Sequence, residues 1–172
     1  MRAVLWRAML DADFNARYWR CIAEKFSRRD FALKIFLAIS ASGAVAGWSV
    51  WSQYPMAWKI LSGAAALASI ASPLLAFSKK AEVSAAHAGL WANLRVRSAD
   101  LWDAFQSKGE TETLQREHSR LRKIAAELEE KEPKLRIPKD ERLACICQQA
   151  VLKAKHLPQR KEAENGNAAQ SA

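Results

Sequence analysis

The chain has 172 residues and a net charge of +9, with 27 Lys and Arg against 18 Asp and Glu. This length suits one modest domain, and three scattered cysteines exclude a disulfide framework and fit a reducing compartment. Residues 35–58 and 60–78 contain no Asp, Glu, Lys or Arg, whereas the rest of the chain is highly charged. The composition therefore predicts one part of the chain for an apolar environment and the other part for water.

An amphipathic helix is predicted over residues 3–28, within a first region that covers residues 1–30. Its apolar face recurs every three or four positions, as a helix requires. That face contains Leu5, Trp6, Met9, Leu10, Phe14, Tyr18, Trp19, Ile22 and Phe26, opposite Arg7, Asp11, Arg17, Arg20, Lys25, Arg28 and Arg29. A basic amphipathic helix is typical of an anionic membrane surface, and packing against a protein partner explains the pattern equally well.

Two apolar segments, 33–53 and 59–78, predict a transmembrane helical hairpin within the region 31–80. A helix needs about 20 residues to cross a bilayer, and both segments are near that length. Basic residues bracket the pair, namely Arg28, Arg29 and Lys34 before it and Lys79 and Lys80 after it. Both segments are rich in Ala, Ser and Gly, so the alternative is a buried hairpin in a soluble helical bundle.

An aromatic cluster surrounds the predicted turn of the hairpin. Trp48, Trp51, Tyr54 and Trp58 are expected at the membrane interface, where aromatic rings with a polar group are enriched. Pro55 is expected to end the first helix because proline cannot donate a backbone hydrogen bond. Lys59 is the only charge near the turn, so the positive-inside rule predicts that both termini lie in the cytoplasm.

Small residues along both segments predict close helix packing and a homo-oligomer in membrane lipid. The expected packing residues are Gly43 and Gly47, which form a Gly-x-x-x-Gly pair, with Gly63, Ala64, Ala68 and Ser69. Ser40, Ser62 and Ser72 are candidates for lining a hydrated path. Pro73 is expected to kink the second helix.

Residues 81–132 predict further cytoplasmic helix, divided at Gly109. Apolar residues at Leu90, Trp91, Leu94, Leu101, Trp102 and Phe105 form one stripe. Leu114, Leu121, Leu128 and Leu135 then recur seven apart, although Pro133 should end the helix before Leu135. A short coiled coil and an ordinary packed helix explain this spacing equally well.

The C-terminal part is predicted to contain a linker and one more helix over residues 133–158. Pro138 and Asp140 should start this helix, and Leu143, Ile146, Ala150 and Val151 lie on one side of it. The tail, residues 159–172, is polar and rich in Ala, Gln and Asn, which predicts disorder.

The sequence contains no catalytic motif, and we therefore expect a protein that is not an enzyme and has no cofactor. There is no glycine-rich phosphate loop, His-Glu-x-x-His motif or nucleophile elbow. Cys145 and Cys147 could supply half of a metal site, but no matching pair exists and no metal is expected. His87 is expected to be structural or solvated. Direct nucleic-acid binding is less favoured because no known nucleic-acid module is apparent.

The layout resembles the SLATT family of bacterial two-transmembrane effector domains over residues 10–110. The residues that carry the resemblance are "ARYWRCIAEKFSRRDFALKI" before the first apolar segment and "HAGLWANLRVRSADLWDAF" after the second. The family occurs beside nucleotide-second-messenger synthases, and similar two-transmembrane effectors accompany some retrons. The resemblance implies antiviral membrane permeabilisation triggered by a sensor protein or nucleoprotein complex encoded nearby, and it transfers no active-site residues.

Two functional hypotheses follow for a membrane hairpin. In the first, the protein oligomerises and permeabilises the inner membrane when its partner sensor triggers it. In the second, it is a membrane-anchored scaffold that recruits a cytoplasmic protein or RNA complex through residues 81–157 and forms no pore. A soluble helical bundle is a more distant alternative.

Overall fold

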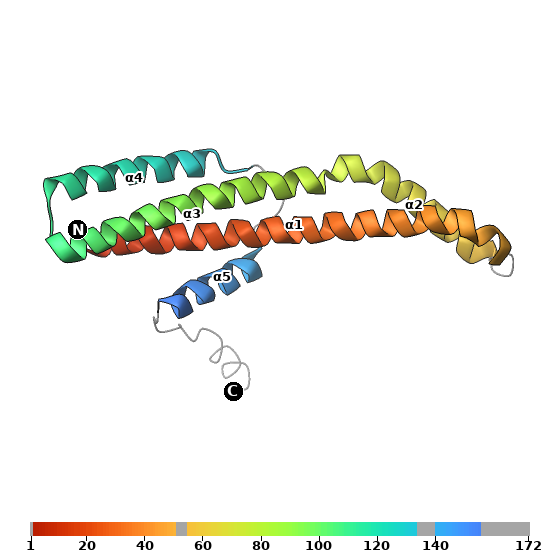
Figure 1. Ribbon diagram of the computed structural model, residues 1–172, viewed down its shortest axis with the longest axis horizontal. Coiled ribbons are helices and arrows are strands. Elements are labelled where there is room, and N and C mark those ends of the chain that lie inside the picture. Colours follow the sequence, from red (N-terminus) through yellow and green to blue (C-terminus); the bar gives the residue numbers. More distant parts are fainter. Residues whose placement is uncertain (1, 51–54, 134–139, 156–172) are drawn as a thin grey trace, which may run out of the picture. The chain divides into compact units, whose positions relative to one another are not determined.

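The computed structural model describes residues 2–50, 55–133 and 140–155, which form helices and no strand (Figure 1). The helices of this described part are α1 (Arg2–Val50), α2 (Pro55–Leu75), α3 (Phe77–Lys108), α4 (Glu112–Glu130) and α5 (Glu141–Ala154). The predicted all-α class is therefore confirmed for these residues. None of the helices, as far as they are described, has the length and apolar character needed to cross a membrane.

α1 is one continuous helix of 49 residues. It joins the predicted amphipathic helix to the predicted first apolar segment. Neither Gly nor Pro occurs at this junction, and two ion pairs with i,i+4 spacing lie beside it. Arg28 Nη2 lies 3.8 Å from Glu24 Oε2, and Lys34 Nζ lies 2.6 Å from Asp30 Oδ2. Because no residue here breaks the ladder of backbone hydrogen bonds, the two segments share one helix.

The end of α3 and the start of α5 confirm the predicted signals at Gly109 and Asp140, and α4 begins at an N-cap that was not predicted. α3 ends before Gly109, whose φ of 72° is accessible to glycine without steric cost. Thr111 Oγ1 accepts a hydrogen bond from the backbone N–H of Leu114 at 3.4 Å, which caps α4. Asp140 Oδ1 accepts one from the N–H of Leu143 at 3.2 Å, which caps α5.

Pro55 and Pro73 lie near the two ends of α2. Pro55 is the first residue of α2, and α1 ends at Val50, before the undescribed residues 51–54. Proline suits the first turn of a helix because the N–H that it lacks would have no helical partner there. α2 ends soon after Pro73, and Ala76 separates it from α3 with a φ of 45°. The chain thus changes direction through a left-handed alanine after the proline.

The chain divides into two compact units, each of which receives residues from both α1 and α3. The described part of the first unit comprises residues 2–18, 90–131 and 140–155. The described part of the second unit comprises residues 19–50, 55–89 and 132–133.

The first unit has a core drawn from four helices. Its buried apolar residues are Leu5, Met9, Ala12 and Ala16 of α1, Trp91, Leu94 and Leu101 of α3, Leu114, Leu121 and Leu128 of α4, and Cys147 and Val151 of α5. The three α4 leucines are the described members of the predicted heptad series. Their burial within this unit shows that α4 packs against its own chain.

Among the described side chains, the second unit has a smaller core. Its buried side chains are Trp19, Ala23, Phe26, Ser84, His87 and Ala88. The Phe26 and Phe77 rings stack with centroids 6.2 Å apart, which joins α1 to the start of α3. Beyond these contacts, the described side chains of residues 31–41 and of α2 are mainly exposed or half-buried.

Candidate functional site

The second unit exposes many large apolar side chains, which we call the apolar hairpin surface. Its members are Phe31, Ile35 and Ile39 of α1 and Met56, Ile60, Leu67, Ile70 and Leu74 of α2, which are between 42% and 81% exposed. The buried leucines of the first unit, by contrast, are at most 8% exposed. An extended exposed apolar surface marks a site of interaction with lipid or protein.

The predicted packing residues of α2 lie open in the single chain. A Cβ atom added to Gly63 would meet no heavy atom within 4 Å among the described residues. Ala64 and Ser69 are exposed, and Ala68 is half-buried. These residues are therefore accessible to a second helix. Gly43 and Gly47 lie in α1, but their side-chain surroundings are outside the described part of the structure.

The predicted interface aromatics cannot be placed as a cluster. Trp51 and Tyr54 fall outside the described residues. Trp48 belongs to α1 and Trp58 to α2, but their side chains are not described either. Their membrane-interface role stays a prediction.

The three predicted path-lining serines have different surroundings. Ser40 is half-buried, and its hydroxyl donates to the carbonyl oxygen of Phe36 at 2.8 Å. This bond to the preceding turn satisfies the hydroxyl within α1. Ser62 is exposed, whereas Ser72 is half-buried and its carbonyl accepts from the N–H of Ala76 at 3.2 Å. Water access along these serines stays a prediction.

A histidine and a tryptophan meet in the core of the second unit. The rings of His87 and Trp19 pack edge to face, with centroids 4.8 Å apart. Burial lowers the pKa of His87 below its usual value, and the carboxylate of Glu132 opposes this shift. Nearby, the Oγ atom of Ser84 is buried without a hydrogen-bond partner among the described residues. His87 is therefore a buried structural residue, one of the two roles expected for it.

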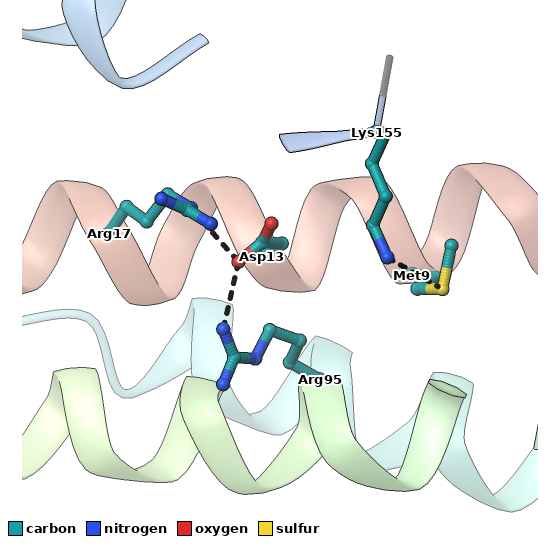
Figure 2. A network of polar contacts seen from close by, with 5 residues as sticks. All are labelled: Met9, Asp13, Arg17, Arg95 and Lys155. Atoms are coloured by element: carbon teal, nitrogen blue, oxygen red, sulfur yellow. Dashed lines mark hydrogen bonds and ion pairs between the residues drawn. The ribbon is translucent and has the colours of Figure 1, made fainter. Parts of the chain in front are cut away.

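A network of charged residues lies in the first unit (Figure 2). Asp13 of α1 is 2% exposed, and its Oδ1 atom accepts hydrogen bonds from two arginines. Arg17 Nε lies 3.1 Å away on the same helix, and Arg95 Nη1 lies 3.2 Å away on α3. At the end of α5, Lys155 Nζ lies 3.9 Å from the Sδ atom of Met9.

Asp13 was not predicted as a member of a site. Its partner Arg95 lies 82 residues away, so the pairing depends on how α1 and α3 align in the fold. One local signal was available, because Asp13 falls among the apolar positions of the first helix and precedes Arg17 by four residues. A carboxylate on a buried face requires a hydrogen-bonding partner.

Two of the cavities lined by described residues lie in the first unit. The larger, about 480 Å³, lies among α1, α3 and α4 and is lined by apolar residues together with Arg7, Asp11, Ser98, His118, Arg122 and Glu129. His118 Nε2 is buried there without a partner among the described residues, and burial, aided by the Arg122 charge, lowers the pKa of this histidine. The smaller, about 320 Å³, is lined by the charged network around Asp13.

No group of three or more His, Cys, Asp or Glu residues in the described ranges is arranged to hold a metal ion. Cys145 is exposed and Cys147 is buried, so the two members of the Cys-x-Cys pair face different surroundings. The comparisons with family models, with curated proteins and with solved structures found no match to this chain.

Proposed function

We propose that the protein is a non-enzymatic membrane effector of a bacterial antiviral or conflict system. In this proposal the hairpin of α1 and α2 enters the inner membrane, with both termini in the cytoplasm. The hairpins of several copies associate, and a partner sensor triggers a rearrangement that permeabilises the membrane. The observation that carries the proposal is the apolar hairpin surface.

The exposure of these apolar side chains makes transfer of the hairpin from water to an apolar environment favourable. Burying one large aliphatic or aromatic side chain is favourable by about 1.5–3 kcal/mol. Among the described residues, the apolar hairpin surface contains eight such side chains, whereas the first unit buries or half-buries most of its large apolar residues and exposes Val4, Leu90, Val96 and Ile146. Lipid and neighbouring copies would both supply the missing apolar cover.

The open small residues of α2 support association between copies. Small side chains let helix backbones approach closely in a bilayer, and hydroxyl groups add interhelical hydrogen bonds. Gly63, Ala64 and Ser69 are accessible in the single chain and so are available to a second hairpin. Shallow contacts of this kind suit a switch, because the two packed states of a switch differ by only a few kcal/mol.

A membrane-anchored scaffold is the second candidate, and the larger cavity of the first unit favours it. This cavity combines apolar residues with His118 Nε2, which has no partner among the described groups. Such a combination suits an inserted side chain from a cytoplasmic protein or nucleoprotein partner. A scaffold would retain the membrane hairpin but would not make the membrane leaky.

Matched isoleucine substitutions test membrane insertion. Ile70→Glu places a charge on α2, where the wild-type side chain is 67% exposed, and Ile146→Glu does so on α5, where it is 60% exposed. A charge near the centre of a membrane helix costs about 2.5–3.5 kcal/mol on insertion scales. We expect Ile70→Glu to reduce the protein recovered in floated membranes after alkaline extraction, and Ile146→Glu to leave it unchanged. Equal recovery of both variants would contradict the membrane proposal.

A further inference from the structure

More positive than negative side chains line the smaller cavity of the first unit. Arg17, Arg95 and Lys155 line it together with the carboxylates of Asp13 and Asp100. The cationic groups come from α1, from α3 and from the end of α5, so the fold gathers them from distant parts of the sequence. Its volume of about 320 Å³ lies at the lower end of the roughly 300–1,000 Å³ range of small-ligand clefts.

Asp13 holds the two arginines in place but occupies only part of their hydrogen-bonding capacity. Each guanidinium carries five N–H donors, and each uses one of them on Asp13 Oδ1. The Asp13 side chain is 3% exposed, whereas those of Arg17 and Arg95 are 36% and 43% exposed. The buried carboxylate therefore fixes both arginines, while each arginine side chain stays partly exposed.

Lys155 adds a strong donor that is poorly matched to its neighbour. Its ammonium contacts the thioether sulfur of Met9 at 3.9 Å, and a thioether is a weak acceptor (Figure 2). Figure 2 shows the lysine side chain extending from α5 towards α1, the helix that also carries Asp13 and Arg17. An anion in the cavity would give this ammonium a far better acceptor than sulfur.

We propose that this cavity binds a phosphate group. A phosphate presents several charged oxygens in a tetrahedral arrangement, which suits cations that converge from three helices. Arginine pairs with phosphate through two parallel N–H donors, and lysine acts as a compact point charge. A soluble phosphorylated molecule and an anionic lipid headgroup carry the same group, so the site recognises the phosphate of either source. The inference does not depend on the proposed membrane function.

Isothermal titration of the full chain with inorganic phosphate tests the site. The protein is purified in a mild detergent, and chloride is adjusted to keep the ionic strength constant. We expect one saturable site per chain. Lys155→Gln should weaken the affinity about tenfold or more, as expected for the loss of one charge-assisted hydrogen bond. Lys153→Gln removes the same charge from an exposed position on the same helix and should bind like the wild type.

A second variant separates the recognition of phosphate from simple charge attraction. Arg17→Lys keeps the positive charge beside Asp13 but removes the guanidinium fork, so it should also weaken phosphate binding. Arg20→Lys, on the exposed side of α1, is its control. Circular dichroism verifies that each variant keeps the wild-type helix content. If both variants bind phosphate as tightly as their controls, the site proposal is wrong.

Short-chain lipids distinguish the two sources of phosphate in the same detergent preparation. Saturation by inorganic phosphate alone supports a soluble phosphorylated ligand. Saturation by dihexanoyl phosphatidic acid without a response to inorganic phosphate, and sensitive to Lys155→Gln, supports a lipid headgroup. Absence of saturable binding to both probes would overturn the proposal and leave the network as a structural ion cluster.

Discussion

Asp13 shows how one buried residue links distant parts of the chain. A charged side chain at 2% exposure is stable only when its hydrogen-bonding needs are met, and Arg17 and Arg95 meet them from two helices. The half-exposed arginines are screened by water, so the network is weaker than a fully buried ion triad. Its main structural effect is to fix the alignment of α1 against α3.

The contribution of this network is measurable by a single isosteric change. Asp13→Asn removes the charge that both arginines contact, and we expect the free energy of unfolding to fall by about 2 kcal/mol. Asp11→Asn makes the same chemical change at an exposed position two residues away and should have a much smaller effect. Chemical denaturation in detergent compares the two variants. Equal losses would show that the Asp13 contacts add little stability.

His87 gives the stability a dependence on pH with a defined sign. Its pKa in the folded protein is lowered, mainly by burial, so the folded state binds a proton less readily than the unfolded state does. The stability is therefore full above the unfolded pKa of about 6.5 and is lost as the pH falls from there towards the folded pKa. His118 acts in the same direction, because its pKa is lowered too.

We expect the free energy of unfolding to decrease between about pH 7.5 and about pH 5.5, on either side of the reference histidine pKa. His87→Gln should reduce the steepness of this decrease even if it lowers the stability at all pH values. Denaturation curves at a series of pH values provide the slope. An unchanged slope in the variant would exclude His87 as a source of the dependence.

At the scale of helices, local rules predicted much of what the structure shows. Gly109 and Asp140 act within three or four residues of their own position, so a single sequence suffices to place the helix ends there. The heptad leucines of α4 likewise predict a buried face of that helix. The charged site around Asp13 forms only when α1, α3 and α5 are aligned with one another. No local pattern in the sequence specifies that alignment, so the site could not be predicted.

The connection between α2 and α3 offers a direct test of backbone strain. Ala76 has a φ of 45°, a left-handed conformation that costs an L-residue with a Cβ atom roughly 1–2 kcal/mol. Glycine adopts it freely, so Ala76→Gly should raise the free energy of unfolding by up to about 1 kcal/mol after the entropy of the more flexible unfolded chain is deducted. Ala85→Gly in α3 should instead lower it by about 1 kcal/mol. A loss of stability in both variants would place Ala76 in an ordinary helical conformation.

Across the whole molecule, apolar side chains are covered very unequally. The first unit buries residues from four helices, whereas α2 keeps Ile60, Leu67 and Leu74 largely exposed. The sequence predicts this contrast, because its two charge-free segments differ from the basic helices around them. The cover proposed for this exposed face, lipid and neighbouring chains, lies outside the fold of one copy.

The effector and scaffold proposals differ in what Ser69→Leu does in cells. Ser69 is exposed on α2 beside other small residues, so a leucine there adds bulk where a neighbouring hairpin should pack and removes a hydroxyl from the contact. Leucine is also more apolar, so membrane insertion should persist.

If assembled hairpins form a leak, over-expression of the wild type should depolarise the cells. Ser69→Leu should slow this depolarisation about threefold or more, which corresponds to roughly 0.6 kcal/mol for one interhelical hydrogen bond. Ser119→Leu, at an exposed position on α4, is the matched control and should depolarise cells like the wild type. A potential-sensitive dye and quantification of the protein in membranes measure both effects. A scaffold predicts instead that the wild type, present in membranes at the same level, leaves the membrane potential intact.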